Sequence, residues 1–342
     1  MKAELIQGKD SGCFIIAEAG VNHNGRLDLA LKLCEEAKKA GADAVKFQTY
    51  ITERIITRTV EQAEYQKNNT GENASQYEML KSLELSFSDF RKVKEYCDQL
   101  GIAFLSTADE EESLDFLISL GISCIKIGSG DIGNLRFLCY AGGKRLPVIL
   151  STGMSSLSDI DLSLNALRAG GAEDITLLHC TTSYPCRFAD VNLRAMVTLR
   201  DAFHLPVGYS DHTLGNIVSV SAVALGARVI EKHFTLDKEM KGPDHKASAS
   251  PEELKSLVDD IRNIEQALGD GRKEPTETER GIMPVVVKRI VAKRSIPEGK
   301  ILSAEDICVK RNDKGLEAKY TELLIGTRAG KEYLPDEPIE LV

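Results

Sequence analysis

Short apolar runs and amphipathic segments alternate along most of this chain. Eight runs rich in Val, Ile and Phe have the length of buried strands, at residues 14–19, 44–49, 103–106, 123–127, 147–150, 175–179, 207–209 and 228–231. Continuous apolar runs of this kind are typical of strands covered on both faces, as in a parallel sheet. Between most of them, apolar residues recur at the spacing of a helix with one buried face.

Two of the expected helices are marked at their ends as well as by their spacing. The first has an apolar stripe closed by a glycine, formed by Leu27, Ala30, Leu31, Cys34, Ala37 and then Gly41. In the last, Ser250 is the expected N-cap, Pro251 occupies the first helical position and Glu253 completes a capping box. Its stripe runs from Leu254 to Leu268, and Gly269 ends it.

These alternating elements predict a closed (β/α)8 TIM barrel over residues 1–268. Eight strand–helix units within residues 14–268 match the roughly 250 residues of a typical barrel of this class. A doubly wound open sheet is the structural alternative, but no Gly-x-Gly-x-x-Gly sequence follows the first expected strand.

The chain changes character after the last expected helix. Residues 269–284 are polar and contain Gly and Pro, which predicts a linker. Residues 285–342 are expected to form a small β-rich domain: residues 289–296 alternate, Pro297 to Gly299 make a turn, and Ile301 and Leu302 begin another short strand. A weak echo of this segment at residues 334–339 indicates a pseudo-repeat.

Composition narrows the class of protein. The chain has 342 residues, of which 42% are hydrophobic, so a large core is expected and a disordered chain is excluded. Its 43 basic and 52 acidic residues give a net charge of −9, which argues against a nucleic-acid-binding or membrane-surface protein. No apolar run reaches the roughly 18 residues of a membrane span.

The first residues and the cysteines together predict a cytoplasmic location. The opening sequence MKAELIQ lacks the apolar stretch of a signal peptide. The 8 cysteines contain no Cys-x-x-Cys pair, so we expect reduced thiols rather than a disulfide framework or a zinc site.

Polar residues follow the expected strands, where the active sites of parallel barrels lie. Lys46 and Lys126 are two cations at strand ends. Residues with hydroxyl groups, and glycines, also stand at or just after the ends of expected strands: Thr107, Gly128, Ser129, Gly130, Ser151, Gly153 and Ser210. Ammonium groups, hydroxyls and accessible backbone N–H groups together make a cradle for a phosphate or a carboxylate.

Two histidines and a glutamate add candidate metal and acid–base chemistry. His212 and His233 come from successive strands, so their imidazoles can converge on one divalent ion. With only two firm nitrogen donors, the remaining ligands would be oxygen or water, which suits an octahedral ion such as Mn²⁺ better than tetrahedral Zn²⁺. Glu18, at the end of the first strand, is a candidate buried carboxylate.

Several of these residues also have a structural interpretation. Thr107 and Glu110 have the spacing of a capping box, and Ser151 is placed to cap a helix. Tyr184 could pack at the barrel rim, and Asn24 with Gly25 is the sequence of a turn. The location of all these side chains on one rim is the stronger argument for function.

The ordered motifs resemble the sialic acid synthase family over essentially the whole chain. They are IAEAGVNHNG at 16–25, VKFQ at 45–48, KIGSGD at 126–131, STGM at 151–154, GYSDHT at 208–213 and EKHF at 231–234. The tail, with IPEG at 296–299 and VKR at 309–311, looks like that family's antifreeze-like (SAF) domain.

This resemblance implies an enzyme that condenses phosphoenolpyruvate with the open-chain aldehyde of an N-acylated mannosamine-type sugar, with C–O cleavage and release of phosphate. It also implies a divalent metal, Mn²⁺ with Mg²⁺ or Co²⁺ as alternatives, bound by His212 and His233. A domain-swapped homodimer is implied, in which Arg311 acts on the partner's barrel. The family would make N-acetylneuraminate or, with nearly the same motifs, N,N'-diacetyllegionaminic acid.

The site residues that the resemblance implies fall into three groups. Phosphoenolpyruvate would be surrounded by Lys46, Thr107, Lys126, Ser129, Ser151, Thr182, Tyr184 and Ser210. The sugar would be held by Glu18, Gln48, Asp244 and Arg311. Glu18, Asp131 and Lys126 are the expected catalytic residues, with the two carboxylates stabilising positive charge at C2 or orienting the water that adds there.

Two other functions compete with this expectation. A Schiff-base aldolase would use Lys126 on pyruvate itself. A carbohydrate-binding module would place binding in the tail and use the barrel as a scaffold.

Overall fold

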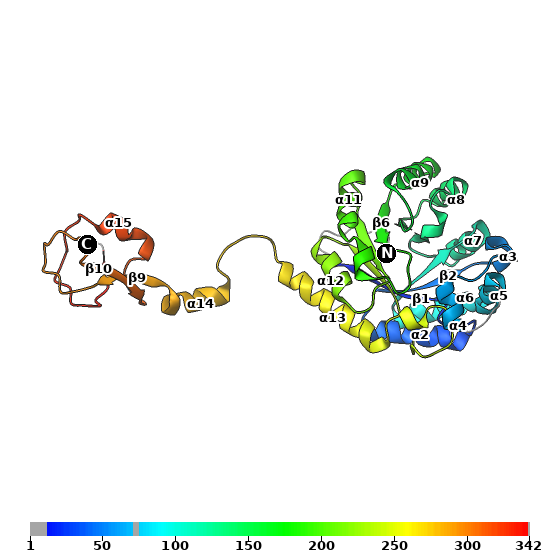
Figure 1. Ribbon diagram of the computed structural model, residues 1–342, viewed down its shortest axis with the longest axis horizontal. Coiled ribbons are helices and arrows are strands. Elements are labelled where there is room, and N and C mark those ends of the chain that lie inside the picture. Colours follow the sequence, from blue (N-terminus) through cyan, green and yellow to red (C-terminus); the bar gives the residue numbers. More distant parts are fainter. Residues whose placement is uncertain (1–11, 71–74, 341–342) are drawn as a thin grey trace. The chain divides into compact units, whose positions relative to one another are not determined.

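Eight parallel strands close into a barrel in the order of the chain, and β8 pairs with β1. Figure 1 shows the computed structural model, which describes residues 12–70 and 75–340. The strands are β1 (Phe14–Gly20), β2 (Ala44–Thr49), β3 (Ala103–Ala108), β4 (Ile125–Ile127), β5 (Val148–Ser151), β6 (Ile175–Cys180), β7 (Val207–Asp211) and β8 (Val229–His233). The predicted (β/α)8 barrel is confirmed.

Helices follow the strands and surround the barrel (Figure 1). The longer ones are α2 (Leu27–Ala40), α6 (Phe87–Leu100), α7 (Glu111–Ser119), α8 (Leu135–Gly142), α9 (Leu157–Gly170), α11 (Arg194–Phe203), α12 (Ile217–Ala224) and α13 (Pro251–Leu268). Shorter pieces at the loops are α3 (Thr52–Ile55), α4 (Glu64–Thr70), α5 (Gln76–Leu83), η1 (Ser129–Asp131), α10 (Phe188–Val191) and η2 (His245–Ala247).

The helix ends show where local sequence decided the structure. Helix α2 ends at Gly41, whose φ of 86° is left-handed, and α13 begins with the predicted capping box between Ser250 and Glu253. The capping box predicted between Thr107 and Glu110 is wrong. Glu110 is itself the N-cap of α7, because its carboxylate accepts the backbone N–H groups of Glu112 and Ser113 at 2.6 and 2.9 Å.

Alternation along the strands separates two apolar layers. Side chains facing outward, such as Ile15, Val45 and Phe47, pack with the helices in the main core. Side chains facing inward fill the barrel interior as a separate cluster, formed by Phe14, Ile16, Ala44, Leu105, Cys124, Ile149, Leu178 and Val229. Successive residues of a strand point to opposite faces, so the residue two places beyond each interior residue also points inward, at the carboxyl end of the barrel.

Residues 270–342 form a second compact unit with its own core. It contains α14 (Glu277–Val286), β9 (Lys288–Ala292), β10 (Ile307–Arg311), η3 (Ala318–Tyr320) and α15 (Thr321–Leu324). Helix α14 begins inside the segment expected to be a linker, because Thr276 and Glu279 form a capping box that the sequence analysis missed. The strand expected to begin at Ile301 is wrong: β9 pairs antiparallel with β10, and Ile301 makes only an isolated bridge to Arg328.

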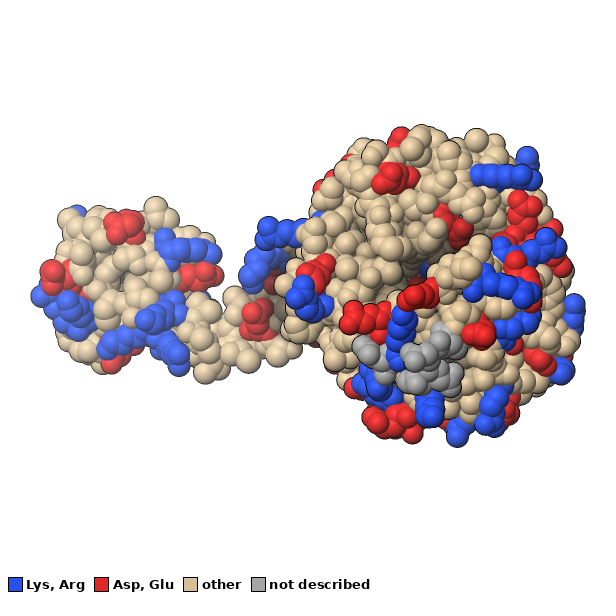
Figure 2. All heavy atoms as spheres, turned by 45° about the vertical axis from the view of Figure 1, so that its right-hand side comes forward, with Lys and Arg blue, Asp and Glu red and all other residues tan. Residues whose placement is uncertain are grey.

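All eight cysteines are free thiols, and six of them are buried. Within the described residues, no helix combines the length and apolar character needed to cross a membrane. Figure 2 shows basic and acidic side chains intermixed over the visible face of the barrel unit, without a broad patch of one sign.

Candidate active site

A pocket of about 210 Å³ lies at the carboxyl ends of the strands. Twelve of the fifteen predicted site residues line it: Glu18, Lys46, Gln48, Thr107, Lys126, Ser129, Ser151, Thr182, Tyr184, Ser210, His212 and His233. Most of them follow an interior core residue by two or four places along the chain, as Glu18 follows Ile16 and Lys126 follows Cys124. The pleat of each strand therefore aims them into one hollow.

Strand β1 changes register at the pocket. Its pairing with β2 shifts between Glu18 and Gly20, which is a bulge of the kind that re-aims a side chain at a barrel rim. Gly20 has a φ of +51°, and a Cβ there would lie 3.2 Å from Glu18 Oε1 and 3.5 Å from Gln48 Nε2. A glycine at this position lets Glu18 and Gln48 share the same corner.

Two buried lysines supply the positive charge of the pocket. Lys46 Nζ lies 2.6 Å from Glu18 Oε2 and donates to Thr107 Oγ1 at 3.0 Å. Lys126 Nζ donates to Ser151 Oγ at 2.8 Å. The lysines are only 3% and 2% exposed, so neither ammonium is solvated by bulk water as it would be on the surface.

Glu231 lies between these lysines and was not assigned a role in the sequence analysis. Its two carboxylate oxygens are 3.6 Å from Lys46 Nζ and 3.7 Å from Lys126 Nζ, and Ser210 Oγ donates to it at 3.0 Å. A signal was present in the sequence, because Glu231 and His233 are two residues apart on one strand and must share a face.

The two glutamates differ in charge state. Burial raises the pKa of Glu18 to about 7, even though Lys46 favours its ionised form. Burial also opposes ionisation of Glu231, but Lys126 and Lys46 outweigh it and lower the pKa to about 2. Pairs of carboxyl groups whose pKa values are pushed apart are typical of acid–base sites. At neutral pH the two ammonium groups face one fully ionised carboxylate, Glu231, and one partly protonated carboxylate, Glu18.

The opposite wall consists of small polar groups from β4, β5 and β6. Ser129 Oγ accepts the backbone N–H of Gly153 at 2.9 Å and lies 3.1 Å from Cys180 Sγ. A Cβ on Gly153 would lie 2.5 Å from Thr182 Oγ1, so this wall closes only around a glycine. The predicted capping role of Ser151 is wrong, since α9 begins at Ser156 and Ser151 instead accepts from Lys126.

The two histidines are adjacent and suited to bind a metal. Their ring centroids are 5.5 Å apart, and the ring of Tyr184 lies 4.2 Å from that of His212 at a tilt of 36°. His212 Nδ1 lies 2.7 Å from the Thr181 carbonyl, so Nδ1 carries the proton and the lone pair of Nε2 is left to bind a metal. His233 Nδ1 is buried without a hydrogen-bond partner among the described residues. Burial lowers the pKa of both rings, so both are neutral, as metal ligands must be.

No group of three or more His, Cys, Asp or Glu side chains arranged to hold a metal exists in the part of the chain that the structure describes. The pair of neutral imidazoles therefore fits an ion whose other ligands are water or substrate oxygen. The Mn²⁺ expectation stays a prediction, and oxygen ligands of this kind are ones that a harder ion accepts readily.

Three predicted site residues lie elsewhere. Asp131 does not line the pocket; its carboxylate accepts from Asn134 Nδ2 at 3.0 Å. Asp244 lies on the loop after β8 and is 9% exposed. Arg311 is the last residue of β10, in the second unit.

The structure adds Asp109 and Cys180 to the pocket wall. Asp109 follows β3, and burial together with the nearby Asp131 raises its pKa to about 7. It also borders a larger cleft of about 590 Å³ whose other lining residues include Glu110, Arg54 and Arg136. Neither residue carried a motif, which is why the sequence analysis did not select them.

The chain matches the NeuB family over residues 33–273. It belongs to this family. It is 48% identical over 94% of its length to the N,N'-diacetyllegionaminic acid synthase of Legionella pneumophila, covering 92% of that protein. It is also 48% identical to the enzyme of the same name from Campylobacter jejuni, over 95% of this chain and 98% of that protein.

Among solved structures, the N-acetylneuraminic acid synthetase of Leptospira borgpetersenii, crystallised with citrate, superposes with a TM-score of 0.70. The two are 37% identical, and the match covers 80% of this chain and 90% of that one. The resemblance to the sialic acid synthase family is thereby confirmed, and the protein is a member of a family of nonulosonic acid synthases.

Proposed function

We propose that the protein condenses phosphoenolpyruvate with the open-chain aldehyde of an N-acylated mannosamine-type sugar, giving a nonulosonic acid and phosphate. One observation carries this proposal: two buried ammonium groups, several hydroxyls and two neutral imidazoles surround one pocket at the barrel mouth. Such a pocket can hold an anion and a metal ion side by side, as a reaction between an enol phosphate and an aldehyde requires.

The sugar we favour is 2,4-diacetamido-2,4,6-trideoxymannose, which would make the product N,N'-diacetyllegionaminic acid. The support is the 48% identity to two synthases of that name, against 37% to the Leptospira N-acetylneuraminic acid synthetase. N-Acetylmannosamine is the second candidate, because the same motifs serve both products.

Phosphoenolpyruvate would lie between the two lysines and the hydroxyl wall. Lys46 and Lys126 would pair with its phosphate and carboxylate, and Ser129, Ser151, Thr182 and Ser210 would donate hydrogen bonds. Thr107 would orient Lys46, to which it is hydrogen-bonded already. The phosphate gains no net charge during the reaction, so the main contribution of these groups is positioning.

A divalent ion, Mn²⁺ in our proposal, would be held by His212 and His233. When bound, it supplies Lewis-acid polarisation of the sugar carbonyl. The Thr181 carbonyl holds the ring of His212 in place, and the ring of Tyr184 contacts both imidazoles.

Carbon–carbon bond formation joins C3 of the enol to the aldehyde carbon, whose oxygen takes up a proton and becomes a hydroxyl, and it leaves positive charge at C2. Glu231, which stays ionised, would stabilise that charge from the pocket floor. Glu18 would accept a proton from the water that adds to C2, since its pKa of about 7 suits general-base work. Collapse of the adduct then breaks the C2–O bond and releases phosphate, so that one water is consumed for each phosphate formed.

The sugar would contact Gln48 in the pocket, Asp244 on the loop after β8, and Arg311 from the second unit of a partner subunit. The domain-swapped dimer and the trans role of Arg311 are part of the proposal. Arg311→Ala should raise the sugar KM strongly and leave the phosphoenolpyruvate KM within about twofold, and unchanged kinetics would argue against this role.

The deciding experiment supplies phosphoenolpyruvate with each of the two sugars and measures phosphate release and product mass. Both signals with at least one sugar support the condensation, and their abolition by a chelator with recovery on adding Mn²⁺ supports the metal. A purified, folded protein that releases no phosphate with either sugar contradicts the proposal.

One observation favours a different reaction, that of a Schiff-base aldolase, as the alternative to the condensation. Burial lowers the pKa of Lys126, as nucleophilic lysines require. Borohydride with pyruvate would then trap a covalent adduct on Lys126, whereas the condensation predicts no adduct.

A further inference from the structure

Two loops that lie far apart in the sequence meet beside the pocket. Residues 22–25 follow β1, and residues 241–248 follow β8, which pairs with β1 in the closed barrel. These loops carry Asn24 and His245, to which neither the pocket nor the proposed mechanism gives a role. We call the contacts between them the loop clasp.

One half of the loop clasp joins Asn24 to His245. Asn24 Nδ2 donates to the Lys241 carbonyl at 2.9 Å, which turns its Oδ1 toward His245 Nε2 at 3.1 Å. His245 Nε2 must therefore carry the proton, and Nδ1 accepts from the Thr235 hydroxyl at 2.6 Å. His245 is completely buried, so both ring nitrogens depend on these partners.

The other half holds the end of the loop. Asn22 Nδ2 lies 2.9 Å from both the Phe234 carbonyl and Ser248 Oγ. Ser248 Oγ donates to the Asp244 carbonyl at 2.7 Å. The backbone of Asp244 is thereby tied through Ser248 to the loop after β1.

Gly242 shows how tightly the clasp is packed. Its φ is +157°, and a Cβ there would lie 2.6 Å from His245 Cδ2 and 2.8 Å from Asn24 Oδ1. The loop can reach its position only with a glycine at this point.

The residue held by the clasp is Asp244, a buried carboxylate. Asp244 is 9% exposed, and among the described residues no ion pair or hydrogen bond to its carboxylate is present. Burial alone raises its pKa to about 6. A buried carboxylate in this state gains most from a ligand that brings hydroxyl or amide N–H donors, and both candidate sugars carry such groups.

We propose that Asn24 and His245 are positioning residues that hold Asp244 for the sugar substrate. This inference rests on the proposed condensation. The two residues touch neither phosphoenolpyruvate nor the metal-binding histidines in the proposal, so they should affect the two substrates unequally.

The test measures kcat and both KM values for Asn24→Gly, which keeps the left-handed backbone of φ 51° but removes the amide. We expect the sugar KM to rise about 10- to 100-fold, as for a group displaced by about 1 Å, with the phosphoenolpyruvate KM within about twofold. His245→Ala should behave alike, and His245→Gln, which can still donate toward Asn24, should recover part of the loss.

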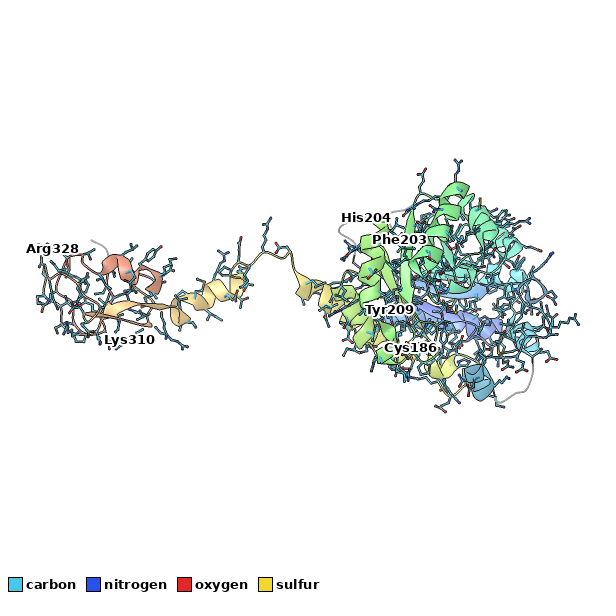
Figure 3. The ribbon with its side chains drawn as sticks, turned by 45° about the horizontal axis from the view of Figure 1, so that its top comes forward. Cys186, Phe203, His204, Tyr209, Lys310 and Arg328 are labelled. Atoms are coloured by element: carbon cyan, nitrogen blue, oxygen red, sulfur yellow. The ribbon has the colours of Figure 1, made fainter. Side chains whose placement is uncertain are left out.

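His204→Asn is the matched histidine control, because His204 caps the end of α11 on the barrel's outer layer (Figure 3) and has the left-handed φ that Asn tolerates. It should leave both KM values unchanged. Circular dichroism and thermal unfolding check that each variant is folded. If Asn24→Gly does not fold, the two KM values of His245→Gln provide the test.

A double mutant separates positioning from general damage. If the clasp acts through Asp244, Asn24→Gly should have little further effect on sugar KM in an Asp244→Ala background. Additive losses, or equal rises in both KM values, would overturn the inference while leaving the proposed condensation intact. A wild-type enzyme that releases no phosphate with either sugar would overturn both.

Discussion

Strands β7 and β8 carry two sets of buried polar and charged side chains on opposite faces, and the sets differ in how many of their polar atoms are hydrogen-bonded. Facing outward under α12, Asp211 accepts from Lys232 Nζ at 2.8 Å, from Ser219 Oγ at 2.6 Å and from the N–H and hydroxyl of Thr213. Facing inward, Glu231 and His233 each keep one buried polar atom without a hydrogen-bond partner in the described part of the chain.

This difference indicates that the outward side chains of β7 and β8 serve stability and that the inward ones are available to a ligand. A buried ion pair whose hydrogen bonds are complete needs nothing further, and removing either partner leaves an uncompensated charge. Buried polar atoms without hydrogen bonds cost free energy, and a ligand that bonds to them removes that cost. The outward pair of Asp211 and Lys232 therefore holds α12 to the barrel, while the inward residues keep hydrogen-bonding capacity that a ligand can use.

The largest expected effect is on activity at the inward face. Lys126→Met removes an ammonium that lies 2.8 Å from Ser151 and 3.7 Å from Glu231, and should lower kcat/KM by about 10²–10³-fold or more. The unfolding temperature should change by only a few degrees, since Lys46 still balances Glu231. Phosphate-release kinetics and thermal unfolding check both parts, and a variant that is active but unstable would reverse the comparison.

The matching change on the outward face should act on stability. Lys232→Met leaves Asp211 buried without its cation and should cost about 3–5 kcal/mol in the free energy of unfolding. Denaturant titration measures this loss. Activity per folded molecule should stay within a few fold of wild type; a loss like that of Lys126→Met would mean that the outward pair also serves the reaction.

A smaller effect is expected where the pocket wall is merely narrowed. Gly153→Ala places a Cβ 2.5 Å from Thr182 Oγ1 and 2.9 Å from Ser129 Oγ, and should raise the phosphoenolpyruvate KM about tenfold through overpacking. Gly130→Ala is the control, because a Cβ there meets nothing within 4 Å although Gly130 lines the same pocket. Equal effects of the two changes would contradict this account of the wall.

The smallest effect on the barrel's kinetics should come from a charge cluster in the second unit. The Asp306 carboxylate has no exposed surface; it accepts from Lys300, from Arg294 Nε at 2.8 Å and from the Ser303 N–H at 3.0 Å. Its hydrogen bond from Lys300 holds the pKa of Asp306 well below the ordinary range. Asp306→Asn should destabilise residues 270–342 at neutral pH.

The pH dependence of this loss has a defined sign. A carboxyl whose pKa is lowered by folding contributes stability above its unfolded pKa of about 4, and the contribution disappears as the pH falls below that value. Hydrogen exchange of the second unit should therefore differ between wild type and Asp306→Asn at pH 7 and converge toward pH 2. A difference that persists at low pH would show that packing, not charge, is responsible.

The sequence by itself determined the barrel and most of the pocket. Apolar runs separated by helical stripes fixed eight strand–helix units, because both periods follow from local backbone geometry. The period of two then aims residues such as Lys46 and Lys126 inward once the barrel closes. Glu231 was equally available by this rule, two residues before His233 in the EKHF motif, but the sequence analysis assigned it no role.

Only the tertiary structure decided which buried polar groups have their hydrogen-bond partners and which do not. Lys232 and Glu231 are neighbours in sequence, yet closure of the sheet gives Lys232 two hydrogen-bond acceptors, Asp211 and the Thr213 carbonyl, and leaves Glu231 between two lysines. The clasp between Asn24 and His245 spans 221 residues and exists only because β8 pairs with β1. Burial and partner geometry depend on contacts distant in the chain, and local sequence patterns do not encode such contacts.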